Sequence, residues 1–508
     1  MKHTLHIVSH LLLATAARAD VTLPAVFSDH MVLQGDVAAP VWGFAEAGEK
    51  VTVTLGNQSK TTTTDASGKW ALKLDKLKSG DAATLKIEGK NSITINDVLI
   101  GEVWLCSGQS NMAFTVGGQE KEPASLPKFR VFTETSSGAG EPQKIGEGTW
   151  KLCSPETYKS FSGTAYFFGR QLHEQLKQPV GLIVSAVGGT PIESWTSAQA
   201  QRTLPEMQSV FAKLDATMAT YDPLVAKAQK EKQLAAFAGL VAKAKAEGRP
   251  VPGPPNPHFD PRALGPGNLF MGKIAPLMPY AIRGAVWYQG ESNARTPESG
   301  RLYAKQLALL IQDWRTCWGQ GDFPFAWVQL PKYHNDQFKG WCEVRESQLK
   351  TLSVPNTGMA VTIDSGHSTQ IHPTNKQEVG RRLSLWALAK VYGLGVPFSG
   401  PLPAGHEARG SEIVLSFNHA AGLQAKGGGE LTGFIIAGED MQWQPAKARI
   451  EGTKVVVSSP VVPKPVAIRY AWEDDPKCNL FNAADLPASP FRTDDWTSPS
   501  TLPIQPKR

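Results

Sequence analysis

Ser110 stands where an apolar run of the chain ends in small and polar residues. The run Val103-Trp104-Leu105-Cys106 is typical of the end of a buried strand, and Ser107-Gly108 after it indicates a turn. A serine at a strand-to-helix turn is rigidly held beside free backbone N–H groups, which can stabilise an oxyanion. Ser110 is therefore a candidate nucleophile, although serine is also a preferred helix cap, and this stretch alone favours the cap.

A nucleophilic serine needs a base, and histidine is the usual one at neutral pH. Two histidines, His367 and His372, follow a later apolar run at 358–363. A helix is expected to begin near Thr374 or Asn375, and Thr374 with Gln377 fits a capping box. Because a loop fixed by a following helix can hold a base in place, both histidines of this loop are candidate bases.

Two further apolar runs end in groups that can donate hydrogen bonds. Residues 180–186 precede Gly188 and Gly189, and residues 284–288 precede Gln289 and Asn293. A tetrahedral intermediate needs such donors. The expected oxyanion hole combines the N–H of Ser110, the N–H of Gly189 or Gly188, and a side-chain amide of Gln289 or Asn293.

These candidates need a scaffold that brings strand ends together. Between residues 99 and 395, short apolar runs alternate with helical stretches, at 98–106, 180–186, 284–288, 325–330 and 358–363. Such alternation predicts an α/β domain whose parallel sheet is covered on both faces. Ligands bind at the carboxyl ends of the strands in sheets of this kind, which is where the candidate residues lie.

The remaining segments flank or interrupt this domain. Residues 20–98 and 396–508 alternate apolar and polar residues with a period of two and predict β domains of sandwich type. In the first, Asp65-Ala66-Ser67-Gly68 indicates a hairpin. Residues 201–267 form an insertion, in which Asp222-Pro223 predicts a cap and the first position of the second of two helices. We expect this insertion to pack against the domain or to form a wall of the site.

Composition narrows the class of protein. The 508 residues are 41% hydrophobic and 19% charged, with a net charge of +6 and no block of like charges, which gives no case for a nucleic-acid partner. Residues 1–19 have the layout of a signal peptide, which predicts a secreted or periplasmic protein. Elsewhere no run approaches the ~18 apolar residues of a membrane span. The histidines and cysteines show no metal-ligand spacing, so neither a metal nor another cofactor is expected.

Four ordered blocks carry a resemblance to a known family. Gly-Gln-Ser-Asn-Met at 108–112, Gly-Gly-Thr-x-x-Glu-x-Trp at 188–195, Trp-Tyr-Gln-Gly-Glu-Ser-Asn at 287–293 and Ile-His-Pro-x-Asn-Lys from 371 resemble the SGNH-hydrolase superfamily. Within it they are similar to the sialate O-acetylesterase and carbohydrate acetylesterase group. Two later stretches, at 469–472 and 486–492, also resemble this group.

The resemblance implies a three-layer SGNH (flavodoxin-like) catalytic domain. It implies Ser110 as nucleophile, His372 as base, and Gly189 and the Gln289 region as oxyanion donors. The group often places an aspartate just before the histidine, where this chain has Thr369, Gln370 and Ile371. Asp364 is the nearest carboxylate, so either Asp364 orients His372 or a backbone carbonyl does so in a Ser–His dyad.

Three residues are candidates for substrate binding. Trp195 could form an apolar wall or stack on a sugar, Glu291 lies at a strand end, and Arg262 could contact a sugar carboxylate. Two of them also have a structural interpretation: loop support for the glutamate and a solvated loop for the arginine.

The expected function is that of a serine esterase removing O-acetyl groups from carbohydrate, with sialic acid as the favoured sugar. An acetylesterase acting on xylan or another glycan is the alternative substrate class. A non-catalytic carbohydrate-binding protein is the alternative of another class. The sequence does not specify the oligomeric state.

Overall fold

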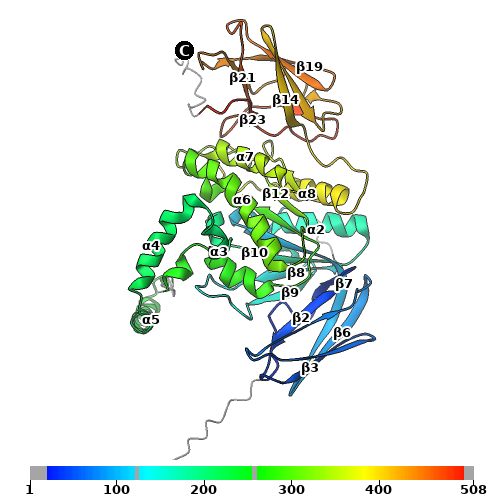
Figure 1. The fold of residues 1–508 in the computed structure, drawn as a ribbon, viewed down its shortest axis with the longest axis vertical. Coiled ribbons are helices and arrows are strands. Elements are labelled where there is room, and N and C mark those ends of the chain that lie inside the picture. The colour runs from blue at the N-terminus through cyan, green and yellow to red at the C-terminus, as the bar shows by residue number, and fades with distance from the viewer. Residues whose placement is uncertain (1–19, 121–124, 254–259, 497–508) are drawn as a thin grey trace, which may run out of the picture.

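The computed structural model describes residues 20–120, 125–253 and 260–496; the predicted signal peptide lies outside these residues. A large, mostly parallel sheet forms the centre of the protein (Figure 1). Its order is β13-β12-β11-β7-β10-β8-β9, and only β9 on this path runs antiparallel to its neighbour. The strands are β7 (Ser92–Gly108), β8 (Leu126–Glu134), β9 (Gly148–Cys153), β10 (Val180–Ala186), β11 (Gly284–Tyr288), β12 (Phe325–Val328) and β13 (Thr357–Ala360).

The strand order places a topological switch point at β7. β7 precedes β10 and β11 in the chain, yet it lies between them in the sheet. The connection after β7 leads to β8 on one side, whereas the connection after β11 leads to β12 on the other. The two diverge between β7 and β11, and a crevice is expected at such a point. Ser110 follows β7 directly and so occupies this position.

Helices cover both faces of the sheet. Trp104 of β7 packs edge-on against Phe168 of α2, whereas Trp287 of β11 packs against Trp314 of α6. Trp287 pairs in register with Ser107, three residues from Trp104, so the two tryptophans project from opposite faces. The helices are α1 (Ser110–Ala113), α2 (Gly163–Leu176), α3 (Ala198–Gln201), α4 (Gln208–Ala219), α5 (Pro223–Ala246), α6 (Pro297–Trp318), α7 (Trp341–Lys350) and α8 (Lys376–Lys390).

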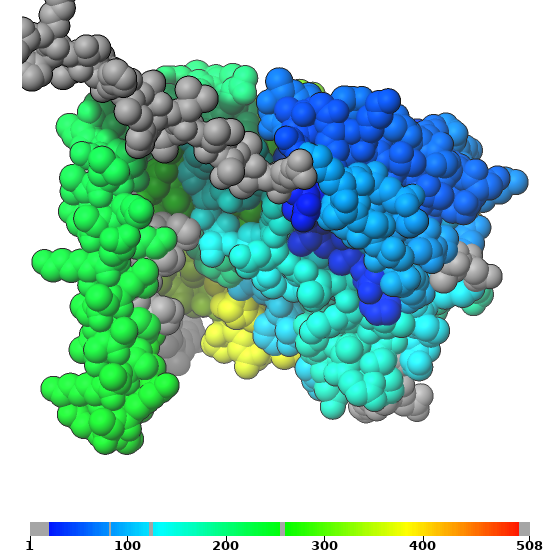
Figure 2. All heavy atoms as spheres, turned by 90° about the horizontal axis from the view of Figure 1, so that it is seen from below, coloured from blue at the N-terminus to red at the C-terminus, as the bar shows by residue number. Residues whose placement is uncertain are grey.

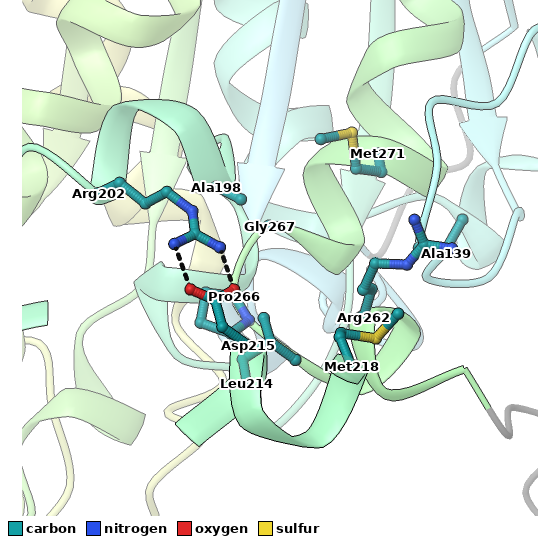
Figure 3. Close-up of a pocket in the computed structure, with 11 residues that line it drawn as sticks. Ala139, Ala198, Arg202, Leu214, Asp215, Met218, Arg262, Pro266, Gly267 and Met271 are labelled. Atoms are coloured by element: carbon teal, nitrogen blue, oxygen red, sulfur yellow. Dashed lines mark hydrogen bonds and ion pairs between the residues drawn. The ribbon is translucent and has the colours of Figure 1, made fainter. Parts of the chain in front are cut away.

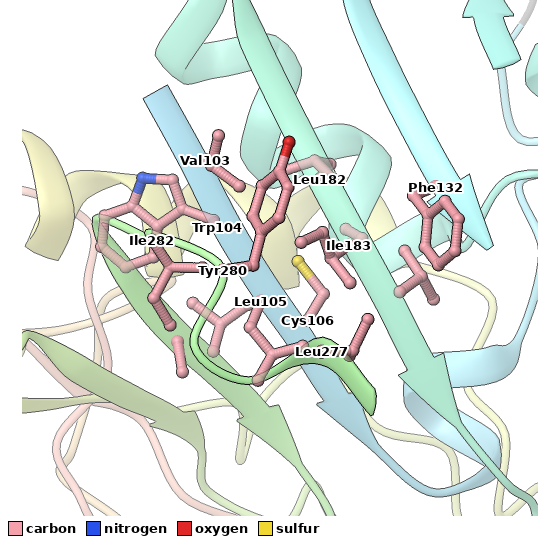
Figure 4. Close-up of a cluster of buried hydrophobic side chains, with 14 of the residues drawn as sticks. Val103, Trp104, Leu105, Cys106, Phe132, Leu182, Ile183, Leu277, Tyr280 and Ile282 are labelled. Carbon is pink, nitrogen blue, oxygen red and sulfur yellow. The ribbon is translucent and has the colours of Figure 1, made fainter. Parts of the chain in front are cut away.

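The core lies between these layers. Figure 4 shows side chains of β7 packed beside Leu182 and Ile183 of β10 and beside Tyr280 and Ile282. Cys106 belongs to this cluster and is 0% exposed, so the cysteine nearest the candidate serine is a core residue. Burial raises the pKa of its thiol far above the ordinary value. The apolar run before Ser110 therefore anchors the serine turn in the centre of the protein.

The N-terminal β region shares a strand with the central sheet. Its strands are β1 (Val32–Gln34), β2 (Ala39–Phe44), β3 (Lys50–Leu55), β4 (Gln58–Thr63), β5 (Lys69–Leu74) and β6 (Gly80–Glu88). β6 pairs with the first part of β7, and the expected boundary after residue 98 falls inside this strand. The hairpin prediction at 65–68 was wrong: the turn forms, but β4 pairs with β3 and β5 pairs with β2.

The C-terminal β region contains β14–β23 and docks on the central domain through polar contacts. Arg492 donates to both oxygens of Glu346 on α7, at 2.8 and 3.0 Å, and Ser489 accepts a hydrogen bond from Gln329. Its strands are β14 (Leu402–Arg409), β15 (Glu412–Asn418), β16 (Gln424–Ala425), β17 (Phe434–Ala437), β18 (Gln444–Pro445), β19 (Lys447–Glu451), β20 (Lys454–Ser458), β21 (Ala467–Tyr470), β22 (Leu480–Phe481) and β23 (Phe491–Arg492).

The insertion forms the two helices expected of it, α4 and α5. The Asp222 carboxylate accepts hydrogen bonds from the N–H groups of Leu224 and Val225, and Pro223 is the first residue of α5. This confirms the predicted cap. Figure 2 shows the insertion as a ridge along one side of the molecule, with the N-terminal β region on the other. None of the helices in the described ranges is long and apolar enough to span a membrane.

Candidate active site

The turn that carries Ser110 depends on a glycine. Gly108 ends β7 with a φ of +140°, and an ideal Cβ there would lie 2.2 Å from the carbonyl oxygen of Tyr288. Only glycine fits such a close backbone approach in this conformation. The next N–H, that of Gln109, donates to the same Tyr288 oxygen at 3.0 Å. The end of β11 thus fixes the backbone that positions Ser110.

Ser110 is half-buried and is the first residue of α1. It lies beside the loop after β10, because an ideal Cβ on Gly188 would be 3.4 Å from the Ser110 Cβ. Gly189 follows with a φ of +72°. Within the described ranges, the N–H groups of Ser110 and Gly189 donate to no protein acceptor. Both are therefore available to a developing oxyanion.

His372 belongs to the loop before α8 and is half-buried. Its ring stacks on Phe114, with centroids 6.1 Å apart and an interplanar angle of 30°. Burial, aided by the positive charge of Lys376, lowers the pKa of His372 below its ordinary value. The predicted capping box is replaced by a cap at Asn375, whose side chain accepts from the Glu378 N–H. His367, the other candidate base, is exposed and accepts from the N–H of Thr369.

Asp364 does not contact His372 in the described ranges. Its two carboxylate oxygens accept hydrogen bonds from Arg382 at 2.6 and 2.8 Å. The Arg382 side chain is 4% exposed, and a buried guanidinium requires such a planar, two-pronged partner. This pairing counts against Asp364 as the group that orients the imidazole, and the Ser–His dyad remains the alternative prediction.

The serine and histidine loops meet through Asn111. The Asn111 amide nitrogen donates to the carbonyl oxygen of Ile371 at 2.9 Å and to Glu291 at 2.6 Å. The Asn111 amide oxygen accepts from the ammonium of Lys376 at 2.5 Å. Each of these contacts joins residues far apart in the chain. The residue after Ser110 is thus bonded to the residue before His372.

Gln289 and Asn293 are engaged inside the protein. The Gln289 amide nitrogen lies 2.8–3.2 Å from three protein acceptors, on Gln109, Thr190 and Asn293. The Asn293 amide nitrogen donates to Glu193 at 2.9 Å. Gln289 is 0% exposed. The geometry therefore corrects the expectation of free amide donors: these side chains tie the three strand-end loops together.

Two predicted substrate contacts are buried. Trp195 is 0% exposed and packs edge-on against Trp287, while its indole N–H donates to Thr190 at 3.0 Å. Glu291 is 1% exposed, and burial raises the pKa of its carboxyl. The structure corrects both predictions, because neither side chain is available at the surface to touch a sugar.

Arg262 is also placed elsewhere. Its guanidinium pairs with Asp260 at 2.8 Å and with Glu141. Figure 3 shows the pocket that it lines together with Arg202 and Asp215, which are paired with each other. Neither Ser110 nor His372 lines that pocket. The Arg262 guanidinium is therefore engaged by two carboxylates at a pocket that includes neither Ser110 nor His372, which counts against the predicted sugar contact.

Sequence reasoning missed the roles of Lys376 and Asn111. Lys376 is the first residue of α8 and is 0% exposed, and burial lowers its pKa to about 7. A cation is disfavoured at a helix N-terminus by the helix dipole, so a lysine directly after the Asn375 cap was an available signal. Asn111 carried no such signal, because its partners lie on other loops.

Fold and site together define an α/β protein with a serine at the switch point of its sheet and a histidine loop bonded to the serine turn. The family model described as "Carbohydrate esterase, sialic acid-specific acetylesterase" matches residues 100–241 and 268–388. The chain belongs to this carbohydrate esterase family.

Named relatives extend the similarity over nearly the whole chain. The sialate O-acetylesterase of Rattus norvegicus is 30% identical, with 91% of this chain and 92% of that protein covered. The Homo sapiens sialate O-acetylesterase is also 30% identical, with 91% of each covered. A solved carbohydrate acetylesterase from Xanthomonas citri is 33% identical, with a TM-score of 0.78 over 94% of this chain and 100% of that one.

Proposed function

We propose that this protein is a serine esterase that removes O-acetyl groups from carbohydrate, with O-acetylated sialic acid as its substrate. The contact that joins Asn111 to Ile371 carries the proposal, since it brings the turn of Ser110 to the loop of His372. The family match and the sialate O-acetylesterases at about 30% identity supply the acetyl and sugar chemistry. The strand order, with Ser110 at the switch point of a parallel sheet, supports an SGNH-type catalytic domain.

The reaction follows from these residues. His372 takes the proton of the Ser110 hydroxyl while the serine Oγ attacks the acetyl carbonyl. The N–H groups of Ser110 and Gly189 bind the oxyanion that forms. His372 then gives that proton to the departing sugar hydroxyl, which leaves an acetyl ester on Ser110. Water, deprotonated by His372, attacks this ester, and acetate leaves as the proton returns to Ser110.

The sugar is tested by acetate release from two substrates at matched acetyl concentration. Wild-type protein is expected to have a higher kcat/KM on O-acetylated sialic acid than on acetylated xylan. The opposite order would assign it to the xylan alternative, which the broader name of the Xanthomonas citri relative also admits. No release from either substrate, or from a chromogenic acetyl ester, would leave the non-catalytic carbohydrate-binding alternative.

Residues 1–19 support a secreted or periplasmic location, because they follow the layout of a signal peptide. Expression of the full chain in a secreting host, followed by N-terminal sequencing, tests this. Mature protein beginning at Asp20 is expected, and an intact Met1 terminus on cytoplasmic protein would contradict it.

A further inference from the structure

Asn111 is held in one amide orientation by charged groups on both sides. Its oxygen faces the Lys376 ammonium, and its nitrogen faces two acceptors, Glu291 and the Ile371 carbonyl. Rotating the amide by half a turn would set donor against donor and acceptor against acceptor. The amide nitrogen of Asn111 therefore always faces the Ile371 carbonyl, which directly precedes His372.

We propose that Asn111, Glu291 and Lys376, the amide clamp, are positioning residues that hold His372 in register with Ser110. This inference rests on the proposed function. His372 has no carboxylate partner among the described residues, since Asp364 is bound to Arg382. The clamp instead fixes the backbone of the histidine loop, and Phe114 supports the ring by stacking.

The burial of the clamp supports a functional role. Asn111 and Lys376 are 0% exposed and Glu291 is 1% exposed. Removing an ammonium and a carboxylate from water has a desolvation cost that often exceeds the gain from their attraction, so a buried pair is weak evidence for stability alone. The Lys376 ammonium and the Glu291 carboxylate both contact the Asn111 amide, which joins the serine and histidine loops. We therefore interpret the buried pair as a device that positions this amide.

The clamp also has an electrostatic effect on the base. Among the residues that the structure describes, Lys376 is the charged group that shifts the pKa of His372, and it lowers this pKa. The groups that face Lys376 from neighbouring elements are the Glu291 carboxylate and the rings of Phe114 and Tyr288, whose centroids lie 5.3 and 5.2 Å from the ammonium. Loss of the Lys376 charge should therefore raise the pKa of His372.

The test compares Asn111→Asp and Lys376→Met with wild type on a chromogenic acetyl ester. Each variant is expected to lose on the order of 100-fold in kcat while KM changes little, because a small misplacement of a catalytic group costs about that much. Lys390→Met is the matched control: it removes the same charge from the same helix, about 21 Å away at 1.5 Å per residue. It should keep wild-type kcat.

A double-mutant cycle separates positioning from general damage. In a His372→Ala background, Asn111→Asp should lower kcat by less than about threefold, because the clamp acts through the histidine. An equal loss in both backgrounds would overturn the proposal, as would wild-type kcat in Lys376→Met.

A titration of His372 by NMR tests the clamp without turnover. The His372 resonance, identified by its absence in His372→Ala, should titrate at higher pH in Lys376→Met and at the wild-type pH in Lys390→Met. An unmoved titration in Lys376→Met would contradict the clamp even if the wild type proved inactive. An inactive wild type with a moved titration would instead contradict only the proposed function. If Asn111→Asp fails to fold, Lys376→Met carries both readouts.

Discussion

The Asp364 carboxylate lies against the guanidinium of Arg382, with N–O distances of 2.6 and 2.8 Å. Arg382 also donates to Glu378 and to the Val361 carbonyl. Asp364 therefore helps to hold the start of the histidine loop, and its carboxylate is engaged by Arg382. The ion pair matters because a Ser–His–Asp triad needs the Asp364 carboxylate beside His372, whereas a Ser–His dyad does not.

Asp364→Ala should keep kcat within about threefold of wild type, whereas loss of an orienting aspartate costs about four orders of magnitude. It should reduce the free energy of unfolding by about 1–3 kcal/mol, because Arg382 loses a partner while buried. Steady-state kinetics and urea unfolding measure the two effects. A loss of kcat approaching that of His372→Ala would restore the triad.

The pH dependence of activity should show the lowered pKa of His372. A general base works in its neutral form, so kcat/KM should fall as pH decreases through the pKa of the free enzyme. Because burial and Lys376 favour the neutral imidazole, this acid limb should be centred below the ordinary 6.5. His367→Asn should leave the limb in place, and a limb that moves with His367 would identify that residue as the base.

Gly108→Ala should damage both stability and activity. A side chain at a φ of +140° is strained by about 1–3 kcal/mol, and its Cβ would meet the Tyr288 carbonyl oxygen at 2.2 Å. We expect a lower Tm and at least a tenfold loss of kcat from displacement of Ser110. Gly118→Ala is the control, because an ideal Cβ there meets nothing within 4 Å. Equal effects of the two substitutions would contradict this account of the turn.

The C-terminal β region should depend on the pair between Arg492 and Glu346, whose side chains are 9% and 8% exposed. Arg492→Met leaves a carboxylate buried with less compensation, which costs about 3–5 kcal/mol when a buried pair is broken. Arg449→Met breaks a more exposed pair with Glu412 and should lower the free energy of unfolding by less. Urea unfolding followed by tryptophan fluorescence compares them, and an equal loss would argue against docking through Arg492.

The central strands were predictable where apolar residues run without interruption. β10 and β11 have the predicted bounds, Val180–Ala186 and Gly284–Tyr288. β8 and β9 were not predicted, because β8 contains Lys128 and Arg130. Arg130 is 3% exposed and donates to Asp97 and to the carbonyl of His30, so it is buried through partners far away in sequence. A buried charged residue of this kind interrupts the hydrophobic pattern from which a strand is predicted.

The site was predictable to the level of loops and less so to the level of side chains. Strand ends located the loops of Ser110, Gly189 and the two candidate histidines, because parallel strands bring their carboxyl ends to one edge. The choice of His372 over His367 came from the resemblance to the family. Trp195 and Glu291 occur at such ends too, but the direction of each side chain depends on packing against α6 and on Asn111. Whether these side chains are buried depends on contacts with residues far away in the chain, so the local sequence does not predict it.

The central claim is that Ser110 is the nucleophile, and one matched pair of variants tests it most directly. Ser110→Ala and Ser107→Ala each remove one hydroxyl, the first from the start of α1 and the second from the end of β7, and Ser107 is 0% exposed. Acetate release from O-acetylated sialic acid should be abolished in Ser110→Ala and stay within about threefold of wild type in Ser107→Ala. Retained release by correctly folded Ser110→Ala would contradict the account.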